Sequence, residues 1–132
     1  MKQKKIYLLI IAVVLIAGGT FLLLRGLSDE DSWIKDSRGV YIKHGNPSLK
    51  PLYVSEQEKT ILCANNLYQQ NKSIINFSSQ CLGICSDYAV DIVHIPRSEE
   101  DNLPENQCEA FRNGQVTHFI ELDKDGEIVK II

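Results

Sequence analysis

The hydrophobic pattern opens with one long uncharged run near the N-terminus. The run covers residues 6–24, and its few small or polar interruptions are Tyr7, Gly18, Gly19 and Thr20. A helix rises about 1.5 Å per residue, so this segment would reach about 28 Å, close to the hydrocarbon thickness of a bilayer. A soluble domain of this size cannot bury a helix that is apolar on every face. The run therefore predicts a transmembrane anchor.

Residues beside the run bear on the choice between an anchor and a cleaved signal peptide. Ala17 and Gly19 are small enough for a cleavage site, but the apolar stretch continues through Phe21–Leu24. No cysteine follows the run closely, which excludes a bacterial lipoprotein anchor. Lysines stand at positions 2, 4 and 5, and every acidic residue follows Arg25. The positive-inside rule thus predicts a single-pass protein of the cell membrane with a cytoplasmic N-terminus and an extracytoplasmic C-terminal domain.

Two short β-prone stretches follow the anchor. Trp33–Lys35 and Val40–Lys43 flank a turn-prone Asp-Ser-Arg-Gly sequence, which predicts a hairpin with Trp33 and Tyr41 packed across it. Prolines at positions 47 and 51 then predict a stiff linker. We therefore expect cytoplasmic lysines and anchor over residues 1–25, a juxtamembrane hairpin and linker over 26–54, and a C-terminal domain over 55–132.

The C-terminal domain carries one helical pattern followed by strand patterns. Ser55 and Glu58 have the spacing of a capping box, and the stretch from there to about Gln70 predicts a helix. Residues 74–77 suggest a short strand or an extended entry. Residues 105–112 suggest a short helix after a proline.

Strand patterns occupy the rest of the domain. Residues 87–95 are rich in β-formers, and residues 115–122 and 127–132 flank an Asp-Lys-Asp-Gly hairpin turn. Ile120 and Leu122 should face one way in their strand, and Phe119 and Glu121 the other. The predicted fold class is α+β, with an N-terminal transmembrane helix and then a small domain of one helix packed on an antiparallel sheet.

The net charge of the part after Arg25 limits the kinds of partner that it can bind. The part after Arg25 has ten basic residues against 17 acidic ones, a net charge of −7. Nucleic acid is excluded as a partner, because phosphate binding needs a basic footprint. An acidic domain of this kind is also unsuited to lying flat on anionic lipid. The expected partners are the membrane, through the anchor, and an unidentified protein or envelope component.

Four cysteines, Cys63, Cys81, Cys85 and Cys108, all follow the anchor. An even number in a small oxidised domain predicts two disulfides. A zinc site is the alternative, but Cys81 and Cys85 lack the two-residue spacing of a zinc knuckle or a thioredoxin-type pair. A Cys81–Cys85 bond would close a very small loop, so each of these cysteines should pair with one of the other two. Cys81 follows the helix end and can fold back to Cys63, whereas Cys85 precedes a strand and can meet the returning loop, so we expect Cys63–Cys81 and Cys85–Cys108.

Two histidines are the candidates for chemistry. His94 and His118 lie in strands predicted to be neighbours, and Asp91 and Glu121 are close to them in sequence. Such a group suits a metal or an acid–base site, although histidines in strands are more often plain surface residues. Common hydrolase, phosphate-loop and zinc-protease motifs do not occur. We therefore assign no catalytic, cofactor-binding or metal residue and expect no cofactor.

A resemblance appears in the run WIKDSRGVYIKHGNPSLKP, residues 33–51. It resembles a juxtamembrane motif, W-I followed by G-x-W/Y-I/V-K-H-G-N-P-S, of small single-anchor exported proteins from bacterial and archaeal lineages. Many of those proteins have a cysteine shortly after the Trp-Ile pair, where this chain has Lys35, so a disulfide in the hairpin is absent. The resemblance implies a compartment and an architecture, and no chemistry.

Three functions are open at this point. The first is a non-enzymatic, membrane-tethered binding or envelope-structural module. The second is a small metal-binding or hydrolytic domain centred on His94 and His118. The third is a minor pilin-like subunit, which is disfavoured because no acidic residue interrupts the start of the apolar run.

Overall fold

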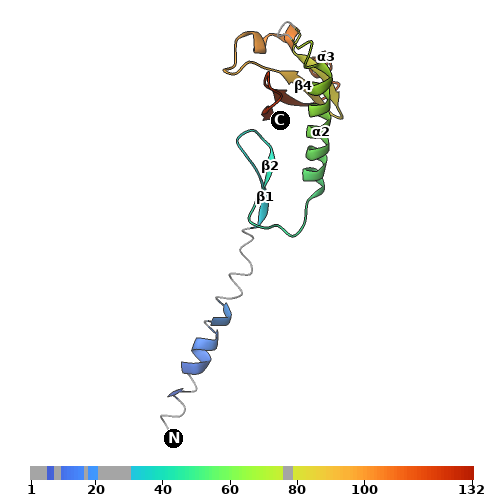
Figure 1. The fold of residues 1–132 in the computed structure, drawn as a ribbon. Coiled ribbons are helices and arrows are strands. Elements are labelled where there is room, and N and C mark those ends of the chain that lie inside the picture. The colour runs from blue at the N-terminus through green and yellow to red at the C-terminus, as the bar shows by residue number, and fades with distance from the viewer. Residues whose placement is uncertain (1–5, 8–9, 17, 21–30, 76–78) are drawn as a thin grey trace.

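The computed structural model describes residues 6–7, 10–16, 18–20, 31–75 and 79–132. The described residues before position 21 are helical (Figure 1), and nowhere in the described ranges is a helix long and apolar enough to cross a membrane. The segment 74–77 lies partly outside these ranges. The strands are β1 (Ser32–Lys35), β2 (Tyr41–His44), β3 (Cys81–Cys85), β4 (Tyr88–Ile92), β5 (His118–Leu122) and β6 (Ile128–Ile131). The helices are α2 (Leu52–Asn71), α3 (Glu109–Arg112) and the short 3₁₀ turns η1 (Glu100–Asn102) and η2 (Pro104–Asn106).

The α2 helix begins four residues earlier than the predicted capping box implies. Pro51 stands at the N-cap position, and its carbonyl accepts hydrogen bonds from the N–H groups of Val54 (3.2 Å) and Ser55 (3.3 Å). No side chain caps the helix, so the predicted capping box of Ser55 and Glu58 is wrong. The φ of Pro51, −62°, already suits a helix entry, and proline has no N–H group that would need a partner there. The helix ends within a residue of its predicted end.

The main sheet is mixed, with the order β3-β4-β5-β6. The outer pairs are antiparallel, as predicted for β5 and β6, whereas β3 was not among the predicted strands. The central strands β4 and β5 run parallel. A parallel pair needs a crossover connection, and residues 93–117 supply it through η1, η2 and α3. We call this segment the crossover. The prediction of a purely antiparallel sheet is therefore wrong at its centre, whereas the α+β class is confirmed.

The two faces of the sheet are covered by different parts of the chain. On one face, called here the helix face, Val90, Ile120 and Leu122 pack with Ala64 of α2. On the other, the crossover face, Phe119 belongs to the cluster covered by α3 and the end of the crossover. Odd and even positions of β5 thus point to opposite faces, which confirms the predicted alternation.

The β1–β2 hairpin is confirmed and lies beside the N-terminal half of α2 (Figure 1). Its turn reaches the edge of the sheet, where the N–H of Ile131 donates to the carbonyl of Arg38 (2.7 Å). Buried Gln57 of α2 donates to the carbonyl of Gly39 (2.9 Å) and accepts from the N–H of Tyr41 (2.8 Å). Across the hairpin Tyr41 is opposite Lys35 and Trp33 is opposite Lys43, so the two aromatic residues are not directly paired. Tyr41 packs on Tyr53 of α2. The hairpin is thereby tied to both α2 and β6.

Two disulfides are present, but with pairing different from the predicted one. Cys63 bonds Cys85, and Cys81 bonds Cys108. In a regular strand, residues four apart point to the same face, yet β3 has a register shift between Cys81 and Gly83. This bulge leaves Cys85 on the helix face beside Cys63 and turns Cys81 to the crossover face beside Cys108.

Candidate functional site

His94 follows the C-terminal end of β4. Its Nδ1 atom lies 2.8 Å from Oδ1 of Asp101 and 3.0 Å from Oγ of Ser98. The three residue types are those of a hydrolase triad, but a triad places the serine and the aspartate on different ring nitrogens. Here both contact the same nitrogen, so the geometry does not activate Ser98 as a nucleophile.

Asp101 connects the end of β4 with the start of the crossover through hydrogen bonds. Its carboxylate, which is fully buried, accepts hydrogen bonds from Nε2 of Gln80 (2.5 Å), the N–H of Ser98 (2.8 Å) and the N–H of His94 (3.3 Å). Burial raises the pKa of Asp101, but the hydrogen bonds from Ser98, His94 and Gln80 outweigh it and bring the pKa to about 2. The Asp101 carboxylate is therefore charged at neutral pH and fixes the start of the crossover through its hydrogen bonds.

His118 lies at the opposite end of the sheet. Its Nδ1 atom is 2.8 Å from Oδ2 of Asp87, and its ring packs on Tyr88 at a centroid distance of 4.9 Å. Hydrogen bonds from the side chains of Thr117 and then His118 hold the pKa of Asp87 below its usual value. Because β4 and β5 are parallel and Tyr88 pairs with His118, His118 stands at their N-terminal ends. The structure therefore does not bring His94 and His118 together.

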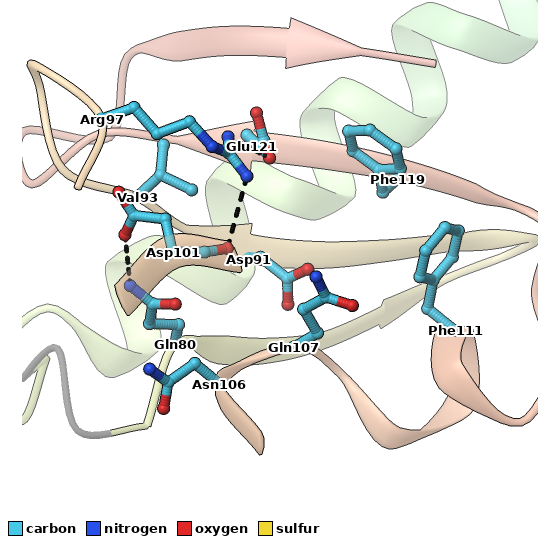
Figure 2. A pocket seen from close by; sticks show the side chains of 10 residues that line it. All are labelled: Gln80, Asp91, Val93, Arg97, Asp101, Asn106, Gln107, Phe111, Phe119 and Glu121. Atoms are coloured by element: carbon cyan, nitrogen blue, oxygen red, sulfur yellow. Dashed lines mark hydrogen bonds and ion pairs between the residues drawn. The ribbon is translucent and has the colours of Figure 1, made fainter. Parts of the chain in front are cut away.

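Asp91, the third candidate, borders a small polar cavity of about 80 Å³ on the crossover face (Figure 2). Figure 2 shows its carboxylate pointing toward Gln107. Oδ1 of Asp91 accepts a hydrogen bond from the N–H of Cys108 (3.2 Å), and the neighbouring Glu121 pairs with Arg97 (2.7 Å). Burial raises the pKa of Asp91 to about 6, and the charge of Glu121 adds to this effect. The volume suits a few water molecules and no organic ligand.

A metal site at Asp91 does not fit the donor atoms. Sγ of Cys81, Sγ of Cys108 and a carboxylate oxygen of Asp91 lie within 4.8 Å of one another. Cysteine binds metal as a thiolate, however, and these two sulfurs are joined in a disulfide. The cluster is therefore an acid beside a disulfide.

A cleft of about 870 Å³ opens between the β1–β2 hairpin, α2 and the starts of β4 and β5. We call it the tyrosine cleft. Its aromatic side chains are Tyr41, Tyr53, Tyr88 and His118. Tyr41 and Tyr53 lie with their ring centroids 4.8 Å apart, and Nζ of Lys35 lies 5.2 Å from the centroid of the Tyr41 ring. The remaining lining residues are Gly39, Glu56, Gln57, Lys59, Thr60, Ser86, Asp87, Ile131 and Ile132.

Sequence reasoning missed the tyrosine cleft. Its walls come from the hairpin, which was predicted as a juxtamembrane element outside the C-terminal domain, from α2, and from strands more than 40 residues further along the chain. No spacing in the sequence relates Tyr41, Tyr53 and Tyr88. Only the hairpin motif was visible in the sequence. Its contacts with α2 are made by Gln57 and by Tyr53, which packs on Tyr41.

Comparison with known proteins adds no relative. No family model, no curated protein and no solved structure matches the chain. The function therefore rests on the geometry of these sites.

Proposed function

We propose that this chain is a membrane-anchored extracytoplasmic binding module, without catalytic activity of its own, that receives an extended segment of a partner protein in the tyrosine cleft. The anchor is supported by the uncharged run 6–24 and the lysines before it. The compartment is supported by the two disulfides, because such bonds persist in oxidising surroundings.

The tyrosine cleft is the observation that carries the proposal. Its volume lies in the range of sites that bind ligands, and it is partly open to solvent. Tyrosine offers a large, stiff contact surface with an apolar ring and a polar end, which is why it is common in protein-binding sites. Tyr53 is 48% exposed although it packs on Tyr41, so this apolar surface is accessible.

An extended segment fits the backbone beside the cleft. In the β1–β2 ladder, the N–H of Tyr41 points away from β1, toward Gln57 of α2. Alternation directs the N–H of Lys43 the same way, so this edge of β2 faces α2. Extended peptides add to such strand edges through main-chain hydrogen bonds and place alternate side chains in pockets. The partner segment would pair with β2 beyond Tyr41, whose own N–H already donates to Gln57, with its side chains against the tyrosines.

Photo-crosslinking in the full chain tests the binding site. A photoreactive residue at Glu56, on the cleft wall, should give one discrete protein adduct in native membranes. The same residue at Asn65, exposed on the far side of α2, is the matched control and should give none. The double variant Tyr41→Ala/Tyr53→Ala should lower the Glu56 adduct at least tenfold. Equal adducts from both positions, an adduct that survives the double variant, or a small-molecule adduct would refute the proposed partner class.

Thiol labelling tests the compartment separately. After mild reduction of intact cells, a membrane-impermeant maleimide should label the cysteines of the C-terminal domain. Labelling that appears only after lysis would place this domain in the cytoplasm and exclude the proposed topology.

A further inference from the structure

The Cys81–Cys108 disulfide lies against a buried acid. Cys81 and Asp91 are directly opposite each other in the β3–β4 ladder, so their side chains share the crossover face. Cys108 comes from the crossover and completes the group, with all three ligand-type atoms within 4.8 Å of one another. The N–H of Cys108 also donates to the Asp91 carboxylate (3.2 Å), which fixes the acid beside the sulfurs.

The disulfide and the acid line different hollows of the molecule. Cys81 and Cys108 line a surface hollow of about 380 Å³ together with residues of α3, whereas Asp91 lines the small polar cavity. Cys81 is partly exposed, but Cys108 is only 1% exposed. This difference in exposure favours attack from solvent on Cys81, and Cys108 would then be the sulfur that departs.

The surroundings of Cys108 favour a protonated sulfur. Its Sγ lies 3.6 Å from the carbonyl oxygen of Gly83 and 3.7 Å from that of Val90. Carbonyl oxygens accept a hydrogen bond from a thiol, but they repel a thiolate, and burial disfavours the charge as well. Departure of this sulfur is therefore slow unless a proton is supplied. Burial raises the pKa of Asp91 to about 6, so the acid carries that proton in mildly acidic solution.

We propose that Cys81–Cys108 is a site of thiol–disulfide exchange with external thiols, in which Asp91 protonates the departing sulfur of Cys108. A thiolate of an external dithiol attacks Sγ of Cys81, the S–S bond breaks, and its electron pair goes to Sγ of Cys108. Cys108 takes the proton of Asp91, which becomes a carboxylate. The second thiolate of the dithiol then attacks the mixed disulfide and releases the thiolate of Cys81. The protein disulfide is reduced by two electrons, and the dithiol is oxidised to a cyclic disulfide.

Other charged groups around Asp91 set when it carries a proton. Glu121 stands opposite it in the β4–β5 ladder, and Arg97 and Asp101 line the same cavity from the crossover. The charge of Glu121 raises the pKa of Asp91, and that of Arg97 lowers it.

The second disulfide is an internal control. Cys63–Cys85 lies on the helix face, with Cys85 2% exposed. Among the residues that the structure describes, no carboxylate lies within 4.8 Å of both of its sulfurs. It lacks a proton donor of this kind and should react without one.

Reduction of the full chain by dithiothreitol between pH 4.5 and 8 tests the proposal. Quenching with iodoacetamide and peptide mapping gives a rate for each disulfide, which is divided by the dithiothreitol thiolate concentration. Cys81–Cys108 should be reduced at least tenfold faster than Cys63–Cys85 at pH 5, and its normalised rate should fall as pH rises through about 6. Similar normalised rates for the two disulfides, or a Cys81–Cys108 rate that does not change with pH, would refute the proposed exchange site.

Two variants separate proton donation from a simple effect of charge. Asp91→Asn should lower the Cys81–Cys108 rate about tenfold at pH 5 and leave the Cys63–Cys85 rate unchanged, which also reports that the fold is intact. If Asp91→Asn matches the wild type at pH 5 and is faster only at higher pH, Asp91 merely repels thiolates and the acid role is wrong. Glu121→Gln removes the neighbouring charge. It should lower the pH at which the Cys81–Cys108 rate falls, while keeping the rate at pH 5 within about twofold. If that pH did not change, Asp91 would not be the proton donor.

Trapping with glutathione identifies the attacked sulfur. A brief reaction with reduced glutathione, stopped by acid, should leave the mixed disulfide on Cys81. A mixed disulfide found mainly on Cys108 would contradict the proposed direction of attack.

Discussion

The two faces of the sheet use the same strands and the same kind of covalent link, yet they differ in chemistry. On the helix face, β4 and β5 present Val90, Ile120 and Leu122 to an apolar cluster. One position away in the same strands, the crossover face presents Asp91 and Glu121, both less than 10% exposed. A buried carboxylate is costly unless it is paired or kept neutral. The contrast shows that the helix face is packed from apolar side chains, whereas the crossover face also buries acids that need polar partners.

Each buried acid on the crossover face has a specific hydrogen-bond or ion-pair partner. Glu121 pairs with Arg97, and Asp101 accepts from Gln80. Among the described residues, no deeply buried side-chain nitrogen or oxygen is without a hydrogen-bond partner. The acids of the crossover face can therefore be buried because residues of the crossover supply polar partners for them. Substitutions on the two faces should consequently differ in their effect on the free energy of unfolding.

Truncating adjacent residues of β5 should show the largest contrast between the faces. Ile120 is completely buried on the helix face, so Ile120→Ala should lower the free energy of unfolding by about 4 kcal/mol. Phe119 is half-buried on the crossover face, where it packs edge-on against Phe111, so Phe119→Ala should cost about 2 kcal/mol. Urea denaturation of the C-terminal domain measures both. Equal losses would mean that the crossover face is packed as tightly as the helix face.

Removing each disulfide should have almost the same effect on stability. The bonds close loops of 22 and 27 residues, for which the chain-entropy model gives about 3.5 kcal/mol each. The double variants Cys63→Ala/Cys85→Ala and Cys81→Ala/Cys108→Ala should therefore unfold at similar urea concentrations. A difference of more than about 1 kcal/mol would show that packing around one bond, and not loop closure, dominates its contribution.

Local features of the fold were predictable from the sequence, whereas long-range ones were not. The β5–β6 turn is encoded within five residues, where the side chain of Asp123 accepts from the N–H groups of Asp125 and Glu127, and Gly126 has a positive φ of 84°. The parallel pairing of β4 and β5 depends on how the crossover packs, which no local pattern reveals. The disulfide pairing failed for a related reason, because a single bulge after Cys81 reverses the face that it occupies.

The candidate site shows the same division. Asp91 was recognised as a candidate because it precedes a histidine in a strand, but its actual neighbours are Cys81 and Cys108. Cys108 lies 17 positions further along the chain, and its N–H reaches Asp91 only through the crossover. Residue type and local sequence thus found the acid, and tertiary structure decided what the acid is next to.

Asp91 should lower stability at neutral pH. Its pKa is about 6 in the folded protein against 3.8 as the ordinary value, so the folded state holds the proton more tightly. Its contribution is most favourable below pH 3.8 and is lost as pH rises through 6, a loss of about 3 kcal/mol. Asp91→Asn should therefore raise the free energy of unfolding at pH 7 by up to about 3 kcal/mol and change little at pH 3.5. Urea denaturation of the oxidised protein at both pH values measures this, and a destabilised variant at pH 7 would contradict it.

Asp101 should show the opposite pH dependence on the same face, with a smaller magnitude. Its pKa of about 2 lies below the ordinary 3.8, because hydrogen bonds from Ser98, His94 and Gln80 favour the carboxylate despite its burial. Its stabilisation is present above pH 3.8 and is lost as pH falls through 2, so Asp101→Asn should cost about 2 kcal/mol at pH 7 and progressively less in acid.

Exposed Asp87, which also contacts a histidine, is the matched control for Asp101, and Asp87→Asn should leave the unfolding midpoint nearly unchanged. Urea denaturation between pH 3 and 7 compares the two variants. If Asp101→Asn were neutral at pH 7, the hydrogen bonds around Asp101 would only offset its burial. We expect the effects of the Asp91 and Asp101 substitutions on the free energy of unfolding to change with pH in opposite directions. That result would show that the crossover face holds one acid that readily takes up a proton and another that stays charged. Because both acids are buried, their hydrogen-bond donors, and not burial alone, would account for the difference.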